Sequence, residues 1–192
     1  AYSMLLPKGW QFNGKLDWRV PGSGCEGTYN YFKAQSADGA YSLEIFPTAI
    51  WNWTSNQYMQ QFNQAQNTYC TQDQPMDAAG YLSNRFAPQQ LGSPAVAGIK
   101  PSEAVVNEMA QNNDKTRQEL MRYGASQVNF YQTAVSAELK WRDNTEGIAL
   151  CGVSISEMII PNPYDGTYSK NVSCVAAKKI VFRFPAGEKE QA

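Results

Sequence analysis

The stretch that decides the fold runs from Gln127 to Phe184 and reads QVNFYQTAVSAELKWRDNTEGIALCGVSISEMIIPNPYDGTYSKNVSCVAAKKIVFRF. Three long runs within it, residues 128–141, 147–160 and 168–184, are rich in Val, Ile, Phe, Tyr and Trp. The two segments between these runs are dominated by Asp, Asn, Gly and Pro, which accept turn geometry. The pattern predicts an antiparallel meander of three strands, on which the rest of the chain packs.

The N-terminal part of the chain predicts a further hairpin. Residues 28–46 read as two strands joined by a turn at Ala37-Asp38-Gly39. In the second of these strands, Tyr41, Leu43 and Ile45 alternate with polar residues and therefore share one face.

Other turns and loops are predicted from local residue types. Asn13-Gly14 lies between two apolar-rich runs, and Asn-Gly in that position is the strongest short-range signal for a hairpin turn. The Gly-, Pro- and Ala-rich residues 91–98 are interpreted as a loop. The acidic tail after Pro185 resembles the first turn of a helix, so we expect the chain to be truncated at its C-terminus.

Helices are predicted in the middle of the chain. The expected helices cover residues 55–67 with Ser55 as N-cap, residues 76–86 ended by Pro88, and residues 102–123 with a break at Asn112-Asn113 and Gly124 as C′ residue. The order of strands, then helices, then strands predicts an α+β fold. We expect one domain over residues 1–192, with a largely antiparallel sheet and its helices inserted between the N-terminal and C-terminal strand groups.

The composition excludes some classes of partner. The chain has 16 basic and 17 acidic residues, and only 17% of its residues are charged, so it lacks the basic footprint of a nucleic-acid-binding protein. No apolar run approaches the length of a membrane-spanning helix. Low charge with many uncharged polar residues suits an exported protein, so we expect a secreted or periplasmic location. The chain starts at Ala1 and shows no signal peptide, so a signal was either removed or left out of this sequence.

The four cysteines are Cys25, Cys70, Cys151 and Cys174, and none of them forms a Cys-x-x-Cys pair. Without histidine, this spacing does not predict a metal site. An even number of cysteines predicts two disulfides in an oxidising compartment, and the alternative is four buried free thiols in a cytosolic protein. The expected register of the last two meander strands places Cys151 opposite Cys174, which leaves Cys25 to pair with Cys70.

Three motifs carry a resemblance to exported bacterial proteins of the PsbP-like class. They are the opening Leu6-Pro7-Lys8-Gly9-Trp10, the Asp38-Gly39 hairpin with its following Leu43-Glu44-Ile45-Phe46-Pro47 and Trp51-Asn52-Trp53, and the passage from Phe184-Pro185 into an acidic segment. The resemblance implies a PsbP-like α+β fold and a non-catalytic accessory or binding role. It implies no particular site residue.

The chain contains no histidine. This excludes Ser-His-Asp and Cys-His sites and histidine-ligated zinc hydrolases, and neither a Walker loop nor a Gly-x-Gly-x-x-Gly sequence occurs. We therefore predict no catalytic residue, no metal and no cofactor. Chemistry by a carboxylate pair remains an alternative, and the available acids are Glu26, Asp38, Glu44, Glu138, Asp143 and Glu157.

Trp51 and Trp53 are the candidate binding residues. They are two positions apart, so in an extended strand both rings point to the same side and could form a ledge for a sugar ring or a protein partner. The alternative is that both rings pack in the core.

Two hypotheses of function follow. The first is a non-catalytic exported protein that binds a protein or cell-envelope partner. The second is a carbohydrate-binding or carbohydrate-cleaving domain that uses exposed tryptophans and two carboxylates. A pocket with two acids of raised pKa beside exposed indoles would favour the second, and an exposed apolar patch without such acids would favour the first.

Overall fold

The computed structural model describes residues 5–18, 28–65, 71–162 and 166–190. Its strands are β1 (Gln11–Trp18), β2 (Thr28–Gln35), β3 (Ser42–Ile45), β4 (Ala49–Thr54), β5 (Thr71–Gln72), β6 (Ala95–Pro101), β7 (Gln127–Lys140), β8 (Thr145–Pro161) and β9 (Tyr168–Pro185). Its helices are α1 (Gln57–Ala65), α2 (Ala78–Tyr81), the π-helical turn η1 (Leu82–Phe86), α3 (Ala87–Gln90), α4 (Glu103–Ala110) and α5 (Asn113–Arg122).

Among the described residues, all the strands belong to one sheet, in the order β1-β2-β3-β9-β8-β7-β6. The strand β9 is long enough to pair with β8 on one side and with both β3 and β4, one after the other, on its other side. Every pairing is antiparallel except the short one between β4 and β5. The predicted α+β class, the largely antiparallel sheet and the three-stranded meander are therefore confirmed.

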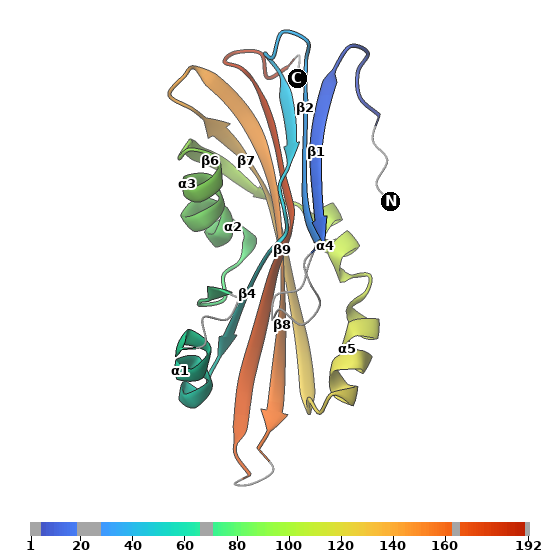
Figure 1. Cartoon of the computed structure of the whole chain (residues 1–192), viewed down its shortest axis with the longest axis vertical. Coiled ribbons are helices and arrows are strands. Elements are labelled where there is room, and N and C mark those ends of the chain that lie inside the picture. The colour runs from blue at the N-terminus through green and yellow to red at the C-terminus, as the bar shows by residue number, and fades with distance from the viewer. Residues whose placement is uncertain (1–4, 19–27, 66–70, 163–165, 191–192) are drawn as a thin grey trace.

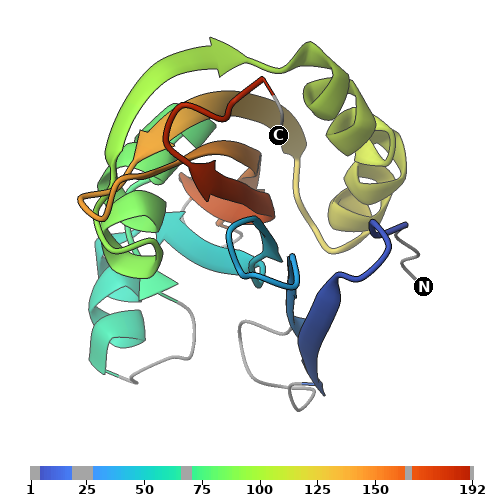
Figure 2. The same ribbon diagram turned by 90° about the horizontal axis from the view of Figure 1, so that it is seen from above.

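Helices lie on both sides of this sheet. The continuous segment α2–η1–α3 packs on one face, and α4 and α5 pack on the other face, against β7 and β8 (Figure 1). The edge strand β6 carries the chain from the first group of helices to the second, and the view from above shows it running between them (Figure 2). We call the face under α2–η1–α3 the covered face and the opposite one the open face.

The main core lies between the covered face and α2–η1–α3. Alternate residues of β7, β8 and β9 supply its apolar floor, including Val135, Ala149 and Val181, and the helical segment supplies Tyr81, Leu82 and Phe86. The alternation follows from the pleat of a strand, which sends successive side chains to opposite faces.

The second helical segment differs from its prediction, because it continues through Pro88 to Gln90. Asp77 caps its start by accepting a hydrogen bond from the Gly80 N–H at 2.7 Å. Before Pro88 the helix widens into the π turn η1, in which the Ala87 N–H donates to the Leu82 carbonyl. A proline in a helix lacks a donor and clashes with the carbonyl four residues earlier, and the wider turn relieves both problems.

The hairpin predicted at Asn13-Gly14 is wrong. Both residues lie inside β1, where they pair with Lys33 and Phe32 of β2, and neither adopts the positive φ that the turn requires. Residues 91–98 are also only partly a loop, because β6 begins at Ala95. In both places long-range pairing overrides the local turn signal.

The predicted helix over residues 102–123 is confirmed, with its break. It is divided into α4 and α5 by turn residues 111–112, and Gly124 adopts φ +96° directly after α5, as expected of a C′ residue. The hairpin over residues 28–46 is confirmed as well, with Gly39 at φ +72° in the turn. Residues 186, 187, 189 and 190 form turns.

The pairing of Cys151 with Cys174 is contradicted by the register. Cys151 lies opposite Lys179, Cys174 lies opposite Ile155, and both cysteines are buried free thiols. The strands pair as far as Pro161 and Tyr168, and a bulge between Gly152 and Val153 shifts the partners further. The two residues are thus separated by about 15 Å along the hairpin, far beyond disulfide reach. Cys25 and Cys70 lie outside the described residues.

A substitution at Gly147 tests how closely β8 approaches Phe182 and Trp141. A Cβ at this position would lie 2.5 Å from the Phe182 carbonyl oxygen and 3.0 Å from the Trp141 ring. We expect Gly147→Ala to lower the free energy of unfolding by about 2–3 kcal/mol, because a buried backbone atom must move. Gly14→Ala, whose Cβ would meet its nearest atom at 3.3 Å, should cost less than half as much. Equal losses in denaturant titrations of the two variants would contradict this account.

Candidate functional site

The strand β3 places apolar side chains on the open face, in the alternating pattern that the sequence predicted. Glu44 lies opposite Val181 of the main core, so Leu43 and Ile45 point to the open face, where they pair with Phe182 and Ile180. Tyr41 stacks on Phe182 with 6.5 Å between the ring centroids. The prediction that Tyr41, Leu43 and Ile45 share a face is confirmed, and that face is apolar.

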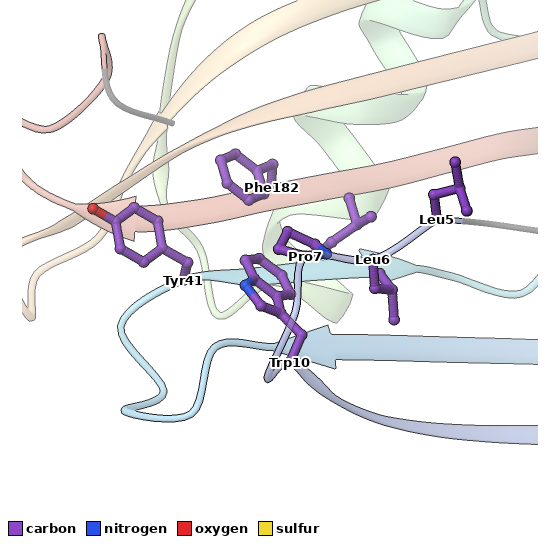
Figure 3. Close-up of a pocket in the computed structure, with 7 residues that line it drawn as sticks. Leu5, Leu6, Pro7, Trp10, Tyr41 and Phe182 are labelled. Carbon is purple, nitrogen blue, oxygen red and sulfur yellow. The ribbon is translucent and has the colours of Figure 1, made fainter.

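The segment before β1 crosses this part of the open face. The Trp10 N–H donates to the Pro7 carbonyl at 3.2 Å, and Gly9 at φ +87° permits the turn between them. The segment and the sheet enclose an open cavity of about 510 Å³, whose lining residues are Leu5, Leu6, Pro7, Trp10, Tyr41, Leu43 and Phe182. Figure 3 shows the rings of Trp10 and Pro7 beside Phe182, with Tyr41 at one end and Leu5 at the other.

The polar group of this cavity is the Tyr41 hydroxyl. It donates a hydrogen bond to the Glu188 carboxylate, which raises the pKa of Tyr41. The remaining lining side chains are apolar apart from the indole N–H of Trp10. The cavity therefore suits an apolar group rather than a charged one.

Apolar side chains continue across the sheet on both sides of the cavity. Phe12 of β1 stacks on Phe32 of β2 at 6.2 Å, and Ile148 of β8 lies opposite Phe182. Strand alternation places many apolar residues on this surface, and eight of them form what we call the open-face strip: Phe12, Leu16, Phe32, Leu43, Ile45, Ile148, Ile180 and Phe182. Phe12, Leu16 and Ile148 are 72%, 56% and 38% exposed.

The helices α4 and α5 cover another part of the open face, over β7 and β8. Met109 of α4 packs at Gly152, where an added Cβ would lie 2.9 Å from its sulfur, and Glu108 pairs with Lys178 at 2.7 Å. Arg117 of α5 lies over the Phe130 ring at 5.4 Å. In Figure 1 these helices stand beside the middle and lower parts of the sheet, so the open-face strip lies beyond them.

The two candidate tryptophans lie on the covered face. Trp51 is 1% exposed, stacks on Tyr81 at 5.2 Å and donates its indole N–H to the Gln74 carbonyl at 3.1 Å. Arg85 lies over its ring at 5.3 Å. Trp53 is half-buried and packs against the same core. The predicted ledge is wrong for Trp51, because its ring forms part of the core, which was the alternative interpretation.

A buried lysine, Lys179, is the chemical feature that the sequence did not predict. It is 2% exposed, its Nζ donates to the Gln90 side-chain oxygen at 3.2 Å, and it lies 5.4 Å above the Phe86 ring. Among the described residues no carboxylate forms an ion pair with it. Burial lowers the pKa of Lys179 to about 8, an effect that Cys151 opposite partly offsets.

The thiols of Cys151 and Cys174 are expected to be unreactive. Burial raises the pKa of Cys151 to about 12 and that of Cys174 to about 11. Thiolates are the reactive form of cysteine, so neither residue has the character of a nucleophile. Both thiols are buried and are not bonded to each other, and the alternative of four free thiols stays untested because Cys25 and Cys70 lie outside the described residues.

The candidate carboxylates do not form a pair in the described structure. Hydrogen bonds from Ser36, Lys189 and Thr145 lower the pKa values of Asp38, Glu138 and Asp143 respectively. Glu44 pairs with Lys33 at 3.1 Å, and Glu157 pairs with Lys170 at 2.6 Å.

Glu26 lies outside the described residues. Within the described ranges, no group of three or more His, Cys, Asp and Glu side chains is arranged to hold a metal ion. The acids that can be placed therefore act as partners of neighbouring donors.

Comparisons with protein-family models, with curated proteins and with solved structures found no match. In the part of the chain that the structure describes, no helix has the length and apolar character needed to cross a bilayer.

The buried Lys179 makes stability depend on pH in a defined direction. Its folded pKa of about 8 lies below the ordinary value of 10.5, so between these values the unfolded chain binds more protons and stability rises with pH. Below pH 8 the burial penalty is fully present. Lys179→Met should therefore raise the free energy of unfolding at pH 7 by up to roughly 3 kcal/mol, and the gain should vanish toward pH 10.5.

The neighbouring Lys178→Met is the matched control, because Lys178 is partly exposed and pairs with Glu108 on the other face. Its effect should stay within about 1 kcal/mol at both pH values. Denaturant titrations of the three proteins at pH 7 and pH 10 measure the difference. A gain for Lys179→Met that is the same at both pH values would contradict the assigned burial of a charged amine.

The cysteine assignment is tested by alkylation without reduction. In the native protein at pH 8, Cys151 and Cys174 should resist modification, because both are buried and their pKa values are raised. In denaturant, both peptides should be fully alkylated, as mass spectrometry would show. Recovery of a peptide in which Cys151 is linked to Cys174 would overturn the observed register.

Proposed function

We propose that this protein is a non-catalytic, exported protein that binds a protein or cell-envelope partner through the open-face strip. The observation that carries the proposal is the contrast between the two faces of one sheet. The covered face buries Trp51 against the helical segment that carries Tyr81 and Phe86, whereas Phe12, Leu16 and Ile148 on the open face stay exposed. A contiguous exposed apolar surface is typical of an interaction site.

The surroundings of the strip resemble the rim of an interface. At the β7 side, Glu138 lies opposite Ile148 and pairs with Lys189 at 2.5 Å. The residue before Lys189, Glu188, accepts the hydrogen bond of Tyr41. An apolar centre with a polar, solvent-accessible border is the usual anatomy of a protein–protein interface. The partner is therefore expected to present apolar side chains, anchored in the cavity beside Trp10.

The carbohydrate hypothesis is less well supported. It requires exposed indoles beside acids of raised pKa. Trp51 is buried, and the pKa values of Asp38, Glu138 and Asp143 are lowered rather than raised. An exposed apolar patch without acids of raised pKa thus favours the binding protein over the carbohydrate hypothesis.

Export and membership of the PsbP-like class form part of the proposal. Export rests on the low charge and the many uncharged polar residues, and the PsbP-like resemblance rests on motifs that include Leu6-Pro7-Lys8-Gly9-Trp10. In the fold, this motif places Trp10 against the cavity and so has a direct role in shaping the proposed binding surface.

Site-specific photo-crosslinking in the source cells tests the proposal. A photoreactive residue in place of Ile148 should give one defined protein adduct, whereas the same residue in place of the exposed Lys115 of α5 should not. With the adduct partner purified, Ile148→Asp should weaken binding at least about tenfold, because the variant puts a charge where the partner's apolar side chains are expected to pack. Lys115→Asp should leave the affinity unchanged.

Equal adducts from both positions, or binding that is unaffected by Ile148→Asp, would overturn the assignment of the strip. Retention on immobilised oligosaccharide that is lost in Trp53→Ala would instead favour the carbohydrate hypothesis.

A further inference from the structure

The strand β1 forms one end of the sheet. It pairs with β2 on one side, and among the described residues no strand pairs with its other side. The opposite end of the sheet is β6, whose one strand partner in the described part of the chain is β7. Each end strand therefore presents backbone N–H and C=O groups that could pair with another chain, unless the sequence prevents it.

The strand β6 has the features that protect an edge. Its register with β7 is interrupted between Ala97 and Lys100, Gly98 adopts φ +59°, and the strand ends at Pro101. A bulge, a lysine and a proline are the usual means of blocking edge-to-edge association.

The strand β1 contains Lys15 but has neither a bulge nor a proline. Its eight residues pair with β2 in an unbroken register and include no proline. Two of its apolar side chains, Phe12 and Leu16, are more than half exposed. A long, regular and partly apolar edge of this kind is a template for strand addition.

The sequence of β1 is also complementary to itself when it is reversed about Gly14. In an antiparallel pair of two such strands centred there, Phe12 of each copy faces Leu16 of the other, Asn13 faces Lys15, and Gln11 faces Asp17. Apolar residues meet apolar residues on the open face, and polar residues meet on the other face. No like charges face each other, and Gly14 meets itself at the centre.

Neighbouring registers fit less well. A shift of the pairing by one residue turns the apolar side chains of one copy to the wrong face. A register centred on Leu16 brings Lys15 opposite Asp17 but leaves Phe12 unpaired within the described strand. The register centred on Gly14 alone engages all the residues from Gln11 to Asp17.

We propose that β1 pairs antiparallel with β1 of a second copy of this chain, about a two-fold axis at Gly14, to form a homodimer with one continuous sheet. Such an interface is isologous, so it closes and leaves neither β1 edge free. Because Phe12 and Leu16 belong to the open-face strip, the dimer joins the two strips into one apolar surface. This goes beyond the proposed function, which requires only one copy.

Analytical ultracentrifugation over a wide range of concentrations tests the dimer. The wild-type chain should show a reversible monomer–dimer equilibrium, and the double variant Phe12→Lys, Leu16→Lys should be monomeric, because it places lysines in opposition across the axis. Both side chains are exposed, so the circular dichroism spectrum should not change. Met121→Lys, at a side chain of α5 that is 49% exposed, is the matched control and should dimerise like the wild type.

Cysteine crosslinking tests the register. An oxidised mixture of Phe12→Cys and Leu16→Cys proteins should yield a disulfide between the two introduced residues, identified by mass spectrometry of the linked peptides. Phe12→Cys alone should not link to itself, because the two copies of residue 12 lie about 13 Å apart in this register. Linkage of Leu16→Cys to itself would overturn the register centred on Gly14.

A wild-type chain that stays monomeric at all concentrations, or a dimer that survives the double lysine variant, would overturn the proposal. The Ile148 photo-crosslink remains a separate readout, so a monomer that still gives the partner adduct would refute the dimer and leave the proposed function standing.

Discussion

The pairing of β8 with β9 is the constraint on which the rest of the fold depends. This hairpin runs from Thr145 opposite Pro185 to Pro161 opposite Tyr168, and β9 carries β3 and β4 on its other side. The bulge between Gly152 and Val153 leaves Ala177 unpaired and changes which residues of β9 face the core. Cys174 and Ala176 face the core before the bulge, whereas Lys179 and Val181 face it afterwards. One extra residue thus determines that Lys178 lies on the open face and Lys179 is buried.

The sequence predicted the features that depend on neighbouring residues or on a long apolar pattern. The meander, the face shared by Tyr41, Leu43 and Ile45, and the helix end at Gly124 are of this kind. It failed where a distant partner decides the outcome. Asn13-Gly14 is a strong turn signal, but β2 holds it in a strand. Cys174 lies away from Cys151 mainly because the hairpin pairs as far as Pro161 and Tyr168, and the bulge adds one more residue to the offset. Nothing in the run Ala177-Lys178-Lys179 marks the extra residue.

The candidate site was missed for a related reason. Alternation assigns side chains to two faces of a strand but does not say which face a helix will cover. Phe182 and Val181 look alike in sequence, yet one borders an open cavity and the other packs under α2–η1–α3. The pattern Trp51-Asn52-Trp53 places both rings on one face of β4, and the pairing of β4 with β9 turns that face to the core, where Trp51 lies opposite Cys174. The path of β6, which takes the chain around the sheet, decides that only part of the open face is covered.

An exposed apolar strip beside an unprotected edge strand is costly for an isolated chain, because both features promote aggregation. The same chain protects its other edge strand, β6, with a bulge and a proline. Exposed apolar side chains and unprotected pairing groups coincide at β1, and β1 is contiguous with the open-face strip. Both features are explained if the β1 edge pairs with a second copy of the chain and the open-face strip binds a partner. If so, the helices α4 and α5 leave the open-face strip uncovered because that strip binds a partner.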